Sequence, residues 1–465
     1  MLSIGGQKIP TSTLVLLLFD VTVIVFCELL AVFVRFPVFE VALGFLTTPG
    51  TTLRIGVVAL VSVISLYYND LYALSVSSRK DELFLRLLQS LGMACLVLAV
   101  LYYAVPGLGL GRGIAVLAAP LIFVLMFGGR ILLQGSGALF AAPQRILVVG
   151  TSPAGVSLVK EIVSRPELNL KVVGFLDERG ENIGKSLVNP RVIGGIDDVE
   201  SIVKRENVDH VILALAERRG MMPVSSLLQM KFNGIGVDHV HAYDEKITGR
   251  LLLEHLSPSW LIFSEGFRKP PFILALKRTT DVLVSLVGLL IGLPIMIFVA
   301  IAIVLETGRP ILFSQERVGL QGKPFRILKF RSMRQNAEAA GPEWAASDDH
   351  RVTKVGRLIR QCRLDELPQL FNVLRGEMSL IGPRPERPFF CDLLEKNVPL
   401  FVLRNSVRPG ITGWAQVKYQ YGSSIEEAKI KLEYDFFYIK HLSLFLDLVI
   451  MLETAKVVFS GRGAK

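Results

Sequence analysis

Cysteine is scarce in this chain and dispersed along it. The four cysteines, Cys27, Cys95, Cys362 and Cys391, form no Cys-x-x-Cys pair and show no metal-ligand spacing. Cys27 and Cys95 lie in apolar runs, where cysteine behaves as a small hydrophobic residue. This pattern argues against a disulfide framework and predicts a reducing compartment.

Two further signatures are missing or incomplete. We expect no cleavable signal peptide, because one lysine precedes a long apolar run that has no small-residue cleavage site. The dinucleotide fingerprint G-x-G-x-x-G is broken, since the turn at 150–155 reads GTSPAG. Ser152 replaces the middle glycine, so the backbone approaches a pyrophosphate less closely. A bound dinucleotide stays possible, but we favour a Rossmann-like fold kept for regulation or assembly.

Apolar residues, in contrast, are abundant. They make up 51% of the 465 residues, and the mean hydropathy of +0.49 predicts membrane segments. The formal net charge of +10 suits anionic lipid surfaces, phosphorylated substrates or nucleic acid. If both termini are cytoplasmic, six of the lysine and arginine residues that flank the spans lie inside and three lie outside, which favours this orientation. Four runs are long enough to span a bilayer, near 14–34, 53–69, 87–105 and 113–133.

The region from about 143 to 265 changes character. "RILVVG", "KVVGFLDE", "VDHVILALAE" and "GIGVDHVHAYD" predict strands alternating with helices, and therefore an α/β domain with a parallel sheet. Asp177 ends the second strand and is interpreted either as a ribose ligand or as a helix cap. His239 and His241 would share one face of a strand, but no third metal donor is evident, so we favour two strand-end histidines.

The run from Asp281 to Glu306 has 24 uncharged residues between its two acids, enough to cross a bilayer. Pro294 stands near its middle, and proline breaks or kinks a helix. A fifth crossing would also export residues 323–408, with 16 basic and 10 acidic side chains, against the positive-inside tendency. We therefore favour a helix that enters the membrane, turns at Leu293-Pro294 and leaves on the same face. A kinked fifth span is the alternative.

Basic residues flank both ends of this apolar run. Lys277 and Arg278 precede it and Arg309 follows it. If the helix is re-entrant, these three side chains are expected to lie together at the lipid headgroups of the inner leaflet.

Two adjacent acids, Asp365 and Glu366, follow several arginines in the last third of the chain. Such mixed charge is either a salt-bridged surface or a phosphate site with a divalent cation. We favour the second, because Pro368 predicts a helix start, where backbone NH groups favour anions. Arg384 lies on a stiff Pro-Arg-Pro segment that suits two-donor phosphate binding. Stacking residues are not interleaved with the cations, so we predict no nucleic-acid binding.

From Lys277 to the C-terminus the chain resembles the catalytic domain of bacterial polyprenyl-phosphate sugar-1-phosphate transferases, the monotopic phosphoglycosyl transferases. The four preceding spans and the Rossmann-like domain resemble the long form of that family. The resemblance rests on "KRTTD", "GKPFRILKFRSM", "DELPQLFNVLRGEMSLIGPRP", "RPGITGWAQV" and "YDFFYIKHLSLFLDL", in this order.

The resemblance implies a reaction and a role for each matching residue. Asp365 would attack the sugar-bearing phosphorus of a UDP-sugar and expel UMP, and a polyprenyl phosphate would then take the phosphosugar. Glu366 would hold Mg²⁺, the expected cofactor. Asp348 and Asp349 are interpreted as solvated loop acids. The residues assigned to substrate binding are Lys329, Arg331, Arg363, Arg384 and Arg408.

The combined prediction is an α/β membrane protein of three parts. Residues 1–140 form a four-helix transmembrane bundle, residues 141–268 a Rossmann-like domain, and residues 269–465 a catalytic phosphoglycosyl transferase domain with a re-entrant helix broken at Pro294. We expect a homodimer in the bacterial inner membrane, with the catalytic domain on the cytoplasmic face, that initiates exopolysaccharide, capsule or O-antigen synthesis.

Two other functions fit the sequence less well. A membrane-bound nucleotide-sugar dehydratase or epimerase would need an intact glycine fingerprint and a Tyr-x-x-x-Lys pair, and the α/β region has neither. A non-catalytic scaffold for polysaccharide enzymes would be supported by loss of the acidic dyad, which is present.

Overall fold

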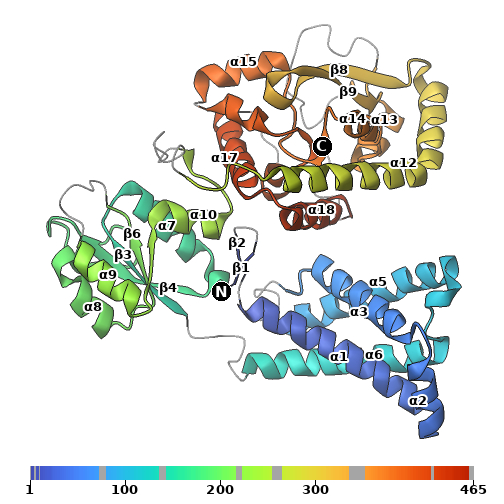
Figure 1. Cartoon of the computed structure of the whole chain (residues 1–465), viewed down its shortest axis with the longest axis horizontal. Coiled ribbons are helices and arrows are strands. Elements are labelled where there is room, and N and C mark those ends of the chain that lie inside the picture. The colour runs from blue at the N-terminus through green and yellow to red at the C-terminus, as the bar shows by residue number, and fades with distance from the viewer. Residues whose placement is uncertain are drawn as a thin grey trace. The chain divides into compact units, whose positions relative to one another are not determined.

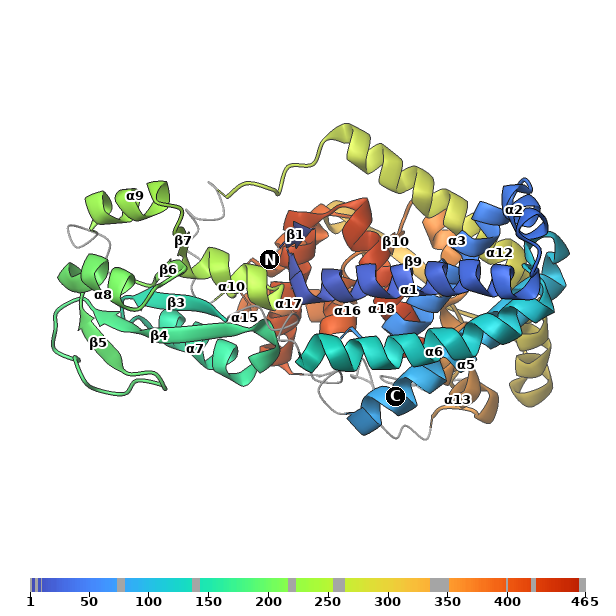
Figure 2. The same ribbon diagram turned by 90° about the horizontal axis from the view of Figure 1, so that it is seen from below.

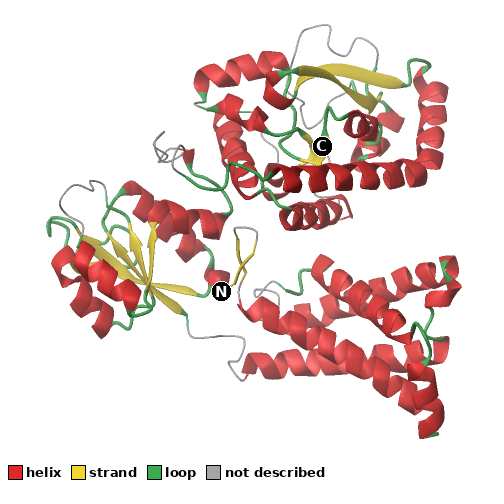
Figure 3. Cartoon of the chain, in the orientation of Figure 1, coloured by secondary structure: helices red, strands yellow, loops and turns green. Residues whose placement is uncertain are grey.

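The computed structural model describes residues 2–4, 7–9, 11–72, 80–135, 143–215, 223–253, 264–334, 351–398, 400–419 and 424–459. The chain divides into two compact units, one mainly of Lys8–Val240 and one mainly of His241–Lys465 (Figure 1). Figure 3 separates the largely helical regions from those that contain strands.

Four long helices of the first unit lie where the sequence predicts spans. By length and composition they are able to cross a membrane. They share an apolar core, and inside it Arg130 donates to the carboxylate of Asp20 and to the carbonyl of Leu71. Both charged side chains are fully buried and paired with each other, as the burial of ionic groups requires. The elements are β1 (Leu2–Ile4), β2 (Gln7–Ile9), α1 (Thr11–Arg35), α2 (Phe39–Thr47), α3 (Thr51–Tyr68), α5 (Lys80–Ala104) and α6 (Arg112–Gly135).

A five-stranded parallel sheet with the order β5-β4-β3-β6-β7 follows, which confirms the predicted parallel α/β region. The last four residues of β3 and all of the adjacent β6 are buried, as expected for central strands covered on both faces. The elements are β3 (Gln144–Val149), α7 (Pro153–Ser164), β4 (Leu170–Asp177), β5 (Val192–Gly195), α8 (Val199–Arg205), β6 (His210–Leu213), α9 (Val224–Phe232) and β7 (Gly236–His239).

The structure changes two interpretations in this region. The Asp177 carboxylate accepts hydrogen bonds from the Thr151 hydroxyl at 3.1 Å and from the backbone and side-chain nitrogens of Asn182. It therefore fastens two loops and caps no helix. The sequence predicted that His239 and His241 share one face of a strand. His241 instead lies in a helix that starts at Val240, after the strand has ended at His239. Among the described residues, no group of three or more His, Cys, Asp or Glu side chains is placed to hold a metal.

In the second unit, short strands and helices pack against one long apolar helix, α12, which lies along the edge of the unit (Figures 1 and 2). β8 and β9 form an antiparallel hairpin, and β10 and β11 form a parallel pair. The elements are α10 (Val240–Thr248), α12 (Pro271–Thr307), β8 (Leu312–Val318), β9 (Pro324–Phe330), α13 (Lys354–Gln361), α14 (Gln369–Arg375), β10 (Ser379–Ile381), α15 (Pro388–Asn397), β11 (Gly410–Thr412), α16 (Trp414–Lys418), α17 (Ile425–His441) and α18 (Leu444–Phe459).

Helix α12 is continuous through Pro294, where the sequence predicted a break. The helix is nevertheless bent into two limbs (Figure 1). A proline ring inside a helix displaces the preceding turn, which accounts for such a bend. The side chains on either side of Pro294 are apolar and exposed, with Leu290 and Phe298 each 76% exposed. On the second limb, Met296 and Val299 instead pack in an apolar cluster with residues of β9 and α13.

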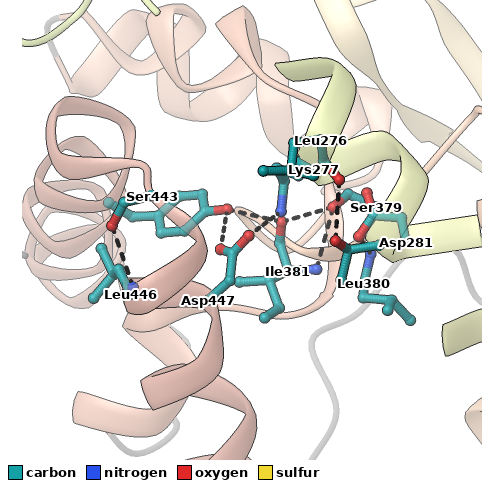
Figure 4. A network of polar contacts seen from close by, with 11 residues as sticks. Leu276, Lys277, Asp281, Ser379, Leu380, Ile381, Ser443, Leu446 and Asp447 are labelled. Carbon is teal, nitrogen blue, oxygen red and sulfur yellow. Dashed lines mark hydrogen bonds and ion pairs between the residues drawn. The ribbon is translucent and has the colours of Figure 1, made fainter. Parts of the chain in front are cut away.

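The first limb of α12 is tied to the rest of the unit by the "KRTTD" residues. Lys277 forms an ion pair of 2.7 Å with Asp447 of α18, and the two side chains point toward one another in Figure 4. Arg278 donates to the last carbonyls of α14, and the carboxylate of Asp281 accepts from the amide of Leu380. The sequence predicted that Lys277 and Arg278 lie at the lipid headgroups. In the structure both side chains instead form tertiary contacts within the unit.

Candidate active site

The acidic dyad lies on a 3-10 turn, Leu364–Glu366, that leads directly into α14. Arg363 precedes it with a left-handed backbone (φ of 57°), which turns the chain out of α13. Both acids are buried, Asp365 being 7% and Glu366 8% exposed. The predicted position of the dyad at a helix start is thus observed.

Glu366 is neutralised by two cations from distant elements. Its Oε1 accepts from Nζ of Lys329 on β9 and from Nη2 of Arg384, both at 2.9 Å. Burial by itself would raise the pKa of Glu366, but Lys329 and Arg384 hold that pKa well below its usual range. Glu366 is therefore ionised and already paired.

Asp365 has a different environment from its neighbour. Within the described part of the chain, its carboxylate takes part in no hydrogen bond or ion pair. Burial raises the pKa of Asp365, and the adjacent charge of Glu366 raises it further. The nearby charges of Lys329 and other cations only partly offset this. The site thus contains one carboxylate that is paired with two cations, Glu366, and one that has no hydrogen-bond partner among the described residues, Asp365.

Asn372 holds the dyad helix against β9. Its Oδ1 accepts from the amide of Leu328 at 3.0 Å, and its Nδ2 donates to the carbonyl of Arg326 at 2.7 Å. This completely buried amide pairs with the strand backbone as another strand would. Because Lys329 is the next residue of β9, the pairing brings its ammonium group to Glu366.

The backbone at residues 383–386 is held by hydrogen bonds to its four successive carbonyl groups. The carbonyl of Pro383 accepts from the amide of Gly410, and that of Arg384 accepts from Arg404. The carbonyl of Pro385 accepts from the Arg317 side chain, and the carbonyl of Glu386 accepts from the amide of Val318. The backbone that carries Arg384 is thereby fixed by contacts from β8, β11 and the 3-10 helix Phe401–Ser406, as the stiff sequence predicts.

Close backbone contact explains the glycines of "IGPRP" and "RPGITGW". A side-chain carbon at Gly382 would overlap the carbonyl oxygen of Arg408, and one at Gly410 would overlap the amide nitrogen of Gly382. These glycines are required by the close approach of the strand ends that present Arg384.

The remaining predicted ligands lie at different distances from the dyad. Arg363 adjoins it and helps to keep the pKa of Glu366 low. Arg331 donates to the carbonyls of Thr307 and Gly308 at the end of α12. Arg408 donates to the carbonyl of Gly376, at the other end of α14. The structure thus brings Lys329, Arg363 and Arg384 together with Asp365 and Glu366, while Arg331 and Arg408 cap helices.

Two side chains near the site were not assigned from the sequence. Arg360 of α13 contributes positive charge beside Asp365. Arg404 holds the backbone of Arg384, from 20 residues away in the chain. No local pattern marks Arg404, since its partners are distant in sequence. Asp348 and Asp349 lie outside the described residues.

Comparison with known proteins identifies two matching regions. Residues 272–461, which contain the dyad, match the family described as bacterial sugar transferase. Residues 68–227 match a family described as a CoA-binding domain, which includes most of the parallel sheet.

Several curated proteins are similar to this chain. UDP-N-acetylgalactosamine-undecaprenyl-phosphate N-acetylgalactosaminephosphotransferase of Aeromonas hydrophila is 44% identical over 232 residues, which cover 50% of this chain and 54% of that protein. The chain thus spans about half the length of this relative. UDP-glucose:undecaprenyl-phosphate glucose-1-phosphate transferase of Klebsiella pneumoniae is 31% identical over 329 residues, 68% of each protein. Undecaprenyl-phosphate glucose phosphotransferase of Komagataeibacter xylinus is 30% identical over 330 residues, covering 69% of this chain and 60% of that protein.

Residues 272–461 contain every sequence block on which the predicted resemblance rests. The similarity to the Klebsiella protein extends beyond the catalytic unit, since 329 residues exceed the length of that unit. The chain belongs to the bacterial sugar transferase family, the polyprenyl-phosphate sugar-1-phosphate transferases.

Proposed function

We propose that this protein transfers a hexose-1-phosphate from a UDP-sugar to undecaprenyl phosphate, giving undecaprenyl diphosphate sugar and UMP. The observation that carries the proposal is the difference between the two adjacent acids. Glu366 is ionised and paired with two cations, whereas Asp365 is buried without a partner in the described residues. The relatives' names supply the substrate classes.

The proposed chemistry has two displacement steps. A carboxylate oxygen of Asp365 attacks the sugar-bearing phosphorus of the UDP-sugar, and the bond from that phosphorus to the bridging oxygen breaks, so that UMP leaves. A phosphate oxygen of the lipid then attacks the same phosphorus and releases the Asp365 carboxylate. Lys329 and Arg384 supply positive charge for the phosphoryl oxygens, which a carboxylate must approach against repulsion.

The residues of the dyad also fit a Mg²⁺ ion. Mg²⁺ is commonly held by one or two carboxylates together with substrate phosphates, and Asp365 and Glu366 offer two adjacent hard oxygen donors. We propose Glu366 as the principal protein ligand. When bound, the ion would supply charge neutralisation for the diphosphate.

We further propose that α12 is re-entrant. Both limbs bind the same compact unit, the first through Lys277 and Arg278 and the second through Thr307, whose carbonyl accepts from Arg331. A transmembrane helix would have to place its two ends on opposite faces of the bilayer. Apolar side chains are exposed along α12 on both sides of Pro294, including Leu290 and Phe298, and this stretch is the part that would enter the lipid. The unit would then lie on the cytoplasmic face of the inner membrane.

The topology predicts the side from which each end of α12 is labelled. In a cysteine-free background, Arg268→Cys before the helix and Lys323→Cys after it should react with an impermeant maleimide from the same side. Both positions are exposed. Right-side-out and inverted vesicles make the comparison, with exposed Cys362 restored as a marker of the catalytic unit. Labelling of the two positions from opposite sides would establish a spanning helix instead.

The pH dependence of the first step should reflect Asp365. Only its carboxylate attacks phosphorus, and its pKa is raised above the usual 3.8 by burial and by Glu366. UMP release should therefore fall as the pH decreases through this raised pKa, at higher pH than an ordinary aspartate would require. The measurement is kcat/KM for the UDP-sugar with undecaprenyl phosphate present, which for a two-step displacement reports the first step on the free enzyme. If kcat/KM falls only near pH 3.8, the usual pKa of an aspartate, the assignment of Asp365 as nucleophile would be contradicted.

The proposed function is tested by UMP release from purified protein in nanodiscs, with Mg²⁺, undecaprenyl phosphate and a panel of UDP-sugars. UDP-N-acetylgalactosamine and UDP-glucose come first, because the named relatives divide between these two donors. UMP release together with a lipid-linked sugar from one donor would support the proposal. Absence of UMP across the panel would favour the scaffold interpretation. Mass photometry of the same sample tests the proposed homodimer.

A further inference from the structure

The Pro-Arg-Pro segment depends on a buried ion pair from the C-terminal part of the chain. We infer that Arg404, held by Asp435 of α17, is a positioning residue that sets the place of Arg384 in the active site. The inference rests on the proposed function, because Arg384 acts there on substrate phosphates.

The geometry of Arg404 suits this role. Its Nη2 donates to the carbonyl oxygen of Arg384 at 3.0 Å and lies 2.8 Å from the carboxylate of Asp435. Its guanidinium also lies over the ring of Phe401, 5.0 Å from the centroid. The Arg404 side chain is 8% exposed and that of Asp435 only 2%, so little water competes for these contacts.

The contact acts on the residue that reaches the dyad. Arg404 holds the carbonyl of Arg384, and the Arg384 side chain in turn donates to Glu366. The Arg384 side chain is 33% exposed, so it is open to a ligand although its backbone is fixed. Moving that backbone would displace the guanidinium relative to Asp365, and a misplacement of about 1 Å can cost about 100-fold in rate.

A purely structural role for the pair is the alternative. Removing the positive charge would leave Asp435 buried and unpaired, which would destabilise the fold whether or not Arg404 positions Arg384. Lysine keeps a positive charge near Asp435, but its side chain is shorter than that of arginine, whereas Nη2 of Arg404 reaches both the Asp435 carboxylate and the Arg384 carbonyl. Arg404→Lys therefore separates positioning from folding.

The test is a double-mutant cycle with Arg404→Lys, Arg384→Ala and the double variant in the full-length protein. Two quantities are measured, kcat/KM for UMP release and the affinity for inorganic pyrophosphate by calorimetry. We expect Arg404→Lys to lower both by about 10-fold, with an unchanged melting temperature, and to have no further effect once Arg384 is alanine. Arg250→Lys is the matched control, because Arg250 pairs with Glu433 on the same helix and contacts neither the dyad nor Arg384 in the described structure.

The outcomes separate this inference from the proposed function. An equal loss from Arg404→Lys in both backgrounds, or an equal loss in the Arg250→Lys control, would overturn the positioning role. If the wild-type protein releases no UMP, but Arg404→Lys lowers pyrophosphate affinity only while Arg384 is present, the positioning role is supported and the proposed reaction is not. A wild-type protein that shows neither UMP release nor pyrophosphate binding would overturn both.

Discussion

Asp365→Asn is expected to lower UMP release by at least about 1,000-fold, because a carboxamide cannot replace the carboxylate as the nucleophile. Asparagine has nearly the same shape as aspartate, and the Asp365 carboxylate holds no other described residue in place. The variant should therefore fold and still bind the UDP-sugar. Its affinity for the UDP-sugar should stay within a few-fold of the wild type.

Intact-mass spectrometry gives an independent measurement of the same step. Wild-type protein incubated with the UDP-sugar but without lipid should gain the mass of one phosphosugar, and Asp365→Asn should not. Glu366→Gln is the matched control, since it changes the adjacent carboxylate in the same way. If Glu366→Gln loses the adduct and Asp365→Asn keeps it, the roles of the two acids are reversed. Full UMP release by Asp365→Asn would place the nucleophile elsewhere.

Trp414→Ala is expected to destabilise the catalytic unit by about 3–5 kcal/mol, the usual cost of deleting a buried aromatic side chain. Trp414 is 1% exposed and its ring stacks with Phe437 of α17, with centroids 5.9 Å apart. Its Nε1 donates to the buried carbonyl of Gly249 at 2.8 Å. The side chain thus joins the segment after α10 to the helix that carries Asp435.

Trp414→Phe separates the hydrogen bond from the packing. Phenylalanine keeps most of the apolar contact but leaves the Gly249 carbonyl unsatisfied, which costs about 1–3 kcal/mol. Hydrogen exchange of α17 amides reports the local stability, and α7 amides in the other unit are the internal reference. Slower or unchanged exchange in α17 of Trp414→Ala would contradict the expected destabilisation. Equal acceleration in α7 would show that the effect is not local.

Much of the candidate site follows from local sequence. Pro368 after Asp365-Glu366 predicts a helix start, and a turn leading into α14 is observed. The two adjacent acids were expected to serve different tasks, since neighbouring side chains on a helical turn diverge. Arg384 is indeed carried on a fixed backbone. The helix start depends on contacts within a few residues, which a sequence pattern records directly, whereas the backbone of Arg384 is also held by distant elements.

Distant partners decide where other side chains point. Arg331 lies two residues after Lys329, and both are expected to line the site; in the structure Nη2 of Arg331 donates to the carbonyl of Thr307 at the end of α12. Lys277 and Arg278 looked like headgroup ligands beside an apolar helix. Their partners, such as Asp447, lie up to 170 residues away, and no local pattern reveals such a pairing.

The sequence by itself determined the apolar helices, the parallel sheet and the position of the acidic dyad, because hydrophobic periodicity and turn residues act over short range. Only the tertiary structure decided which acid is engaged. Glu366 meets Lys329 and Arg384 across 37 and 18 residues, while Asp365 does not. Charge pairing depends on where separate elements come together in space, and that is a property of the packed fold rather than of any one segment.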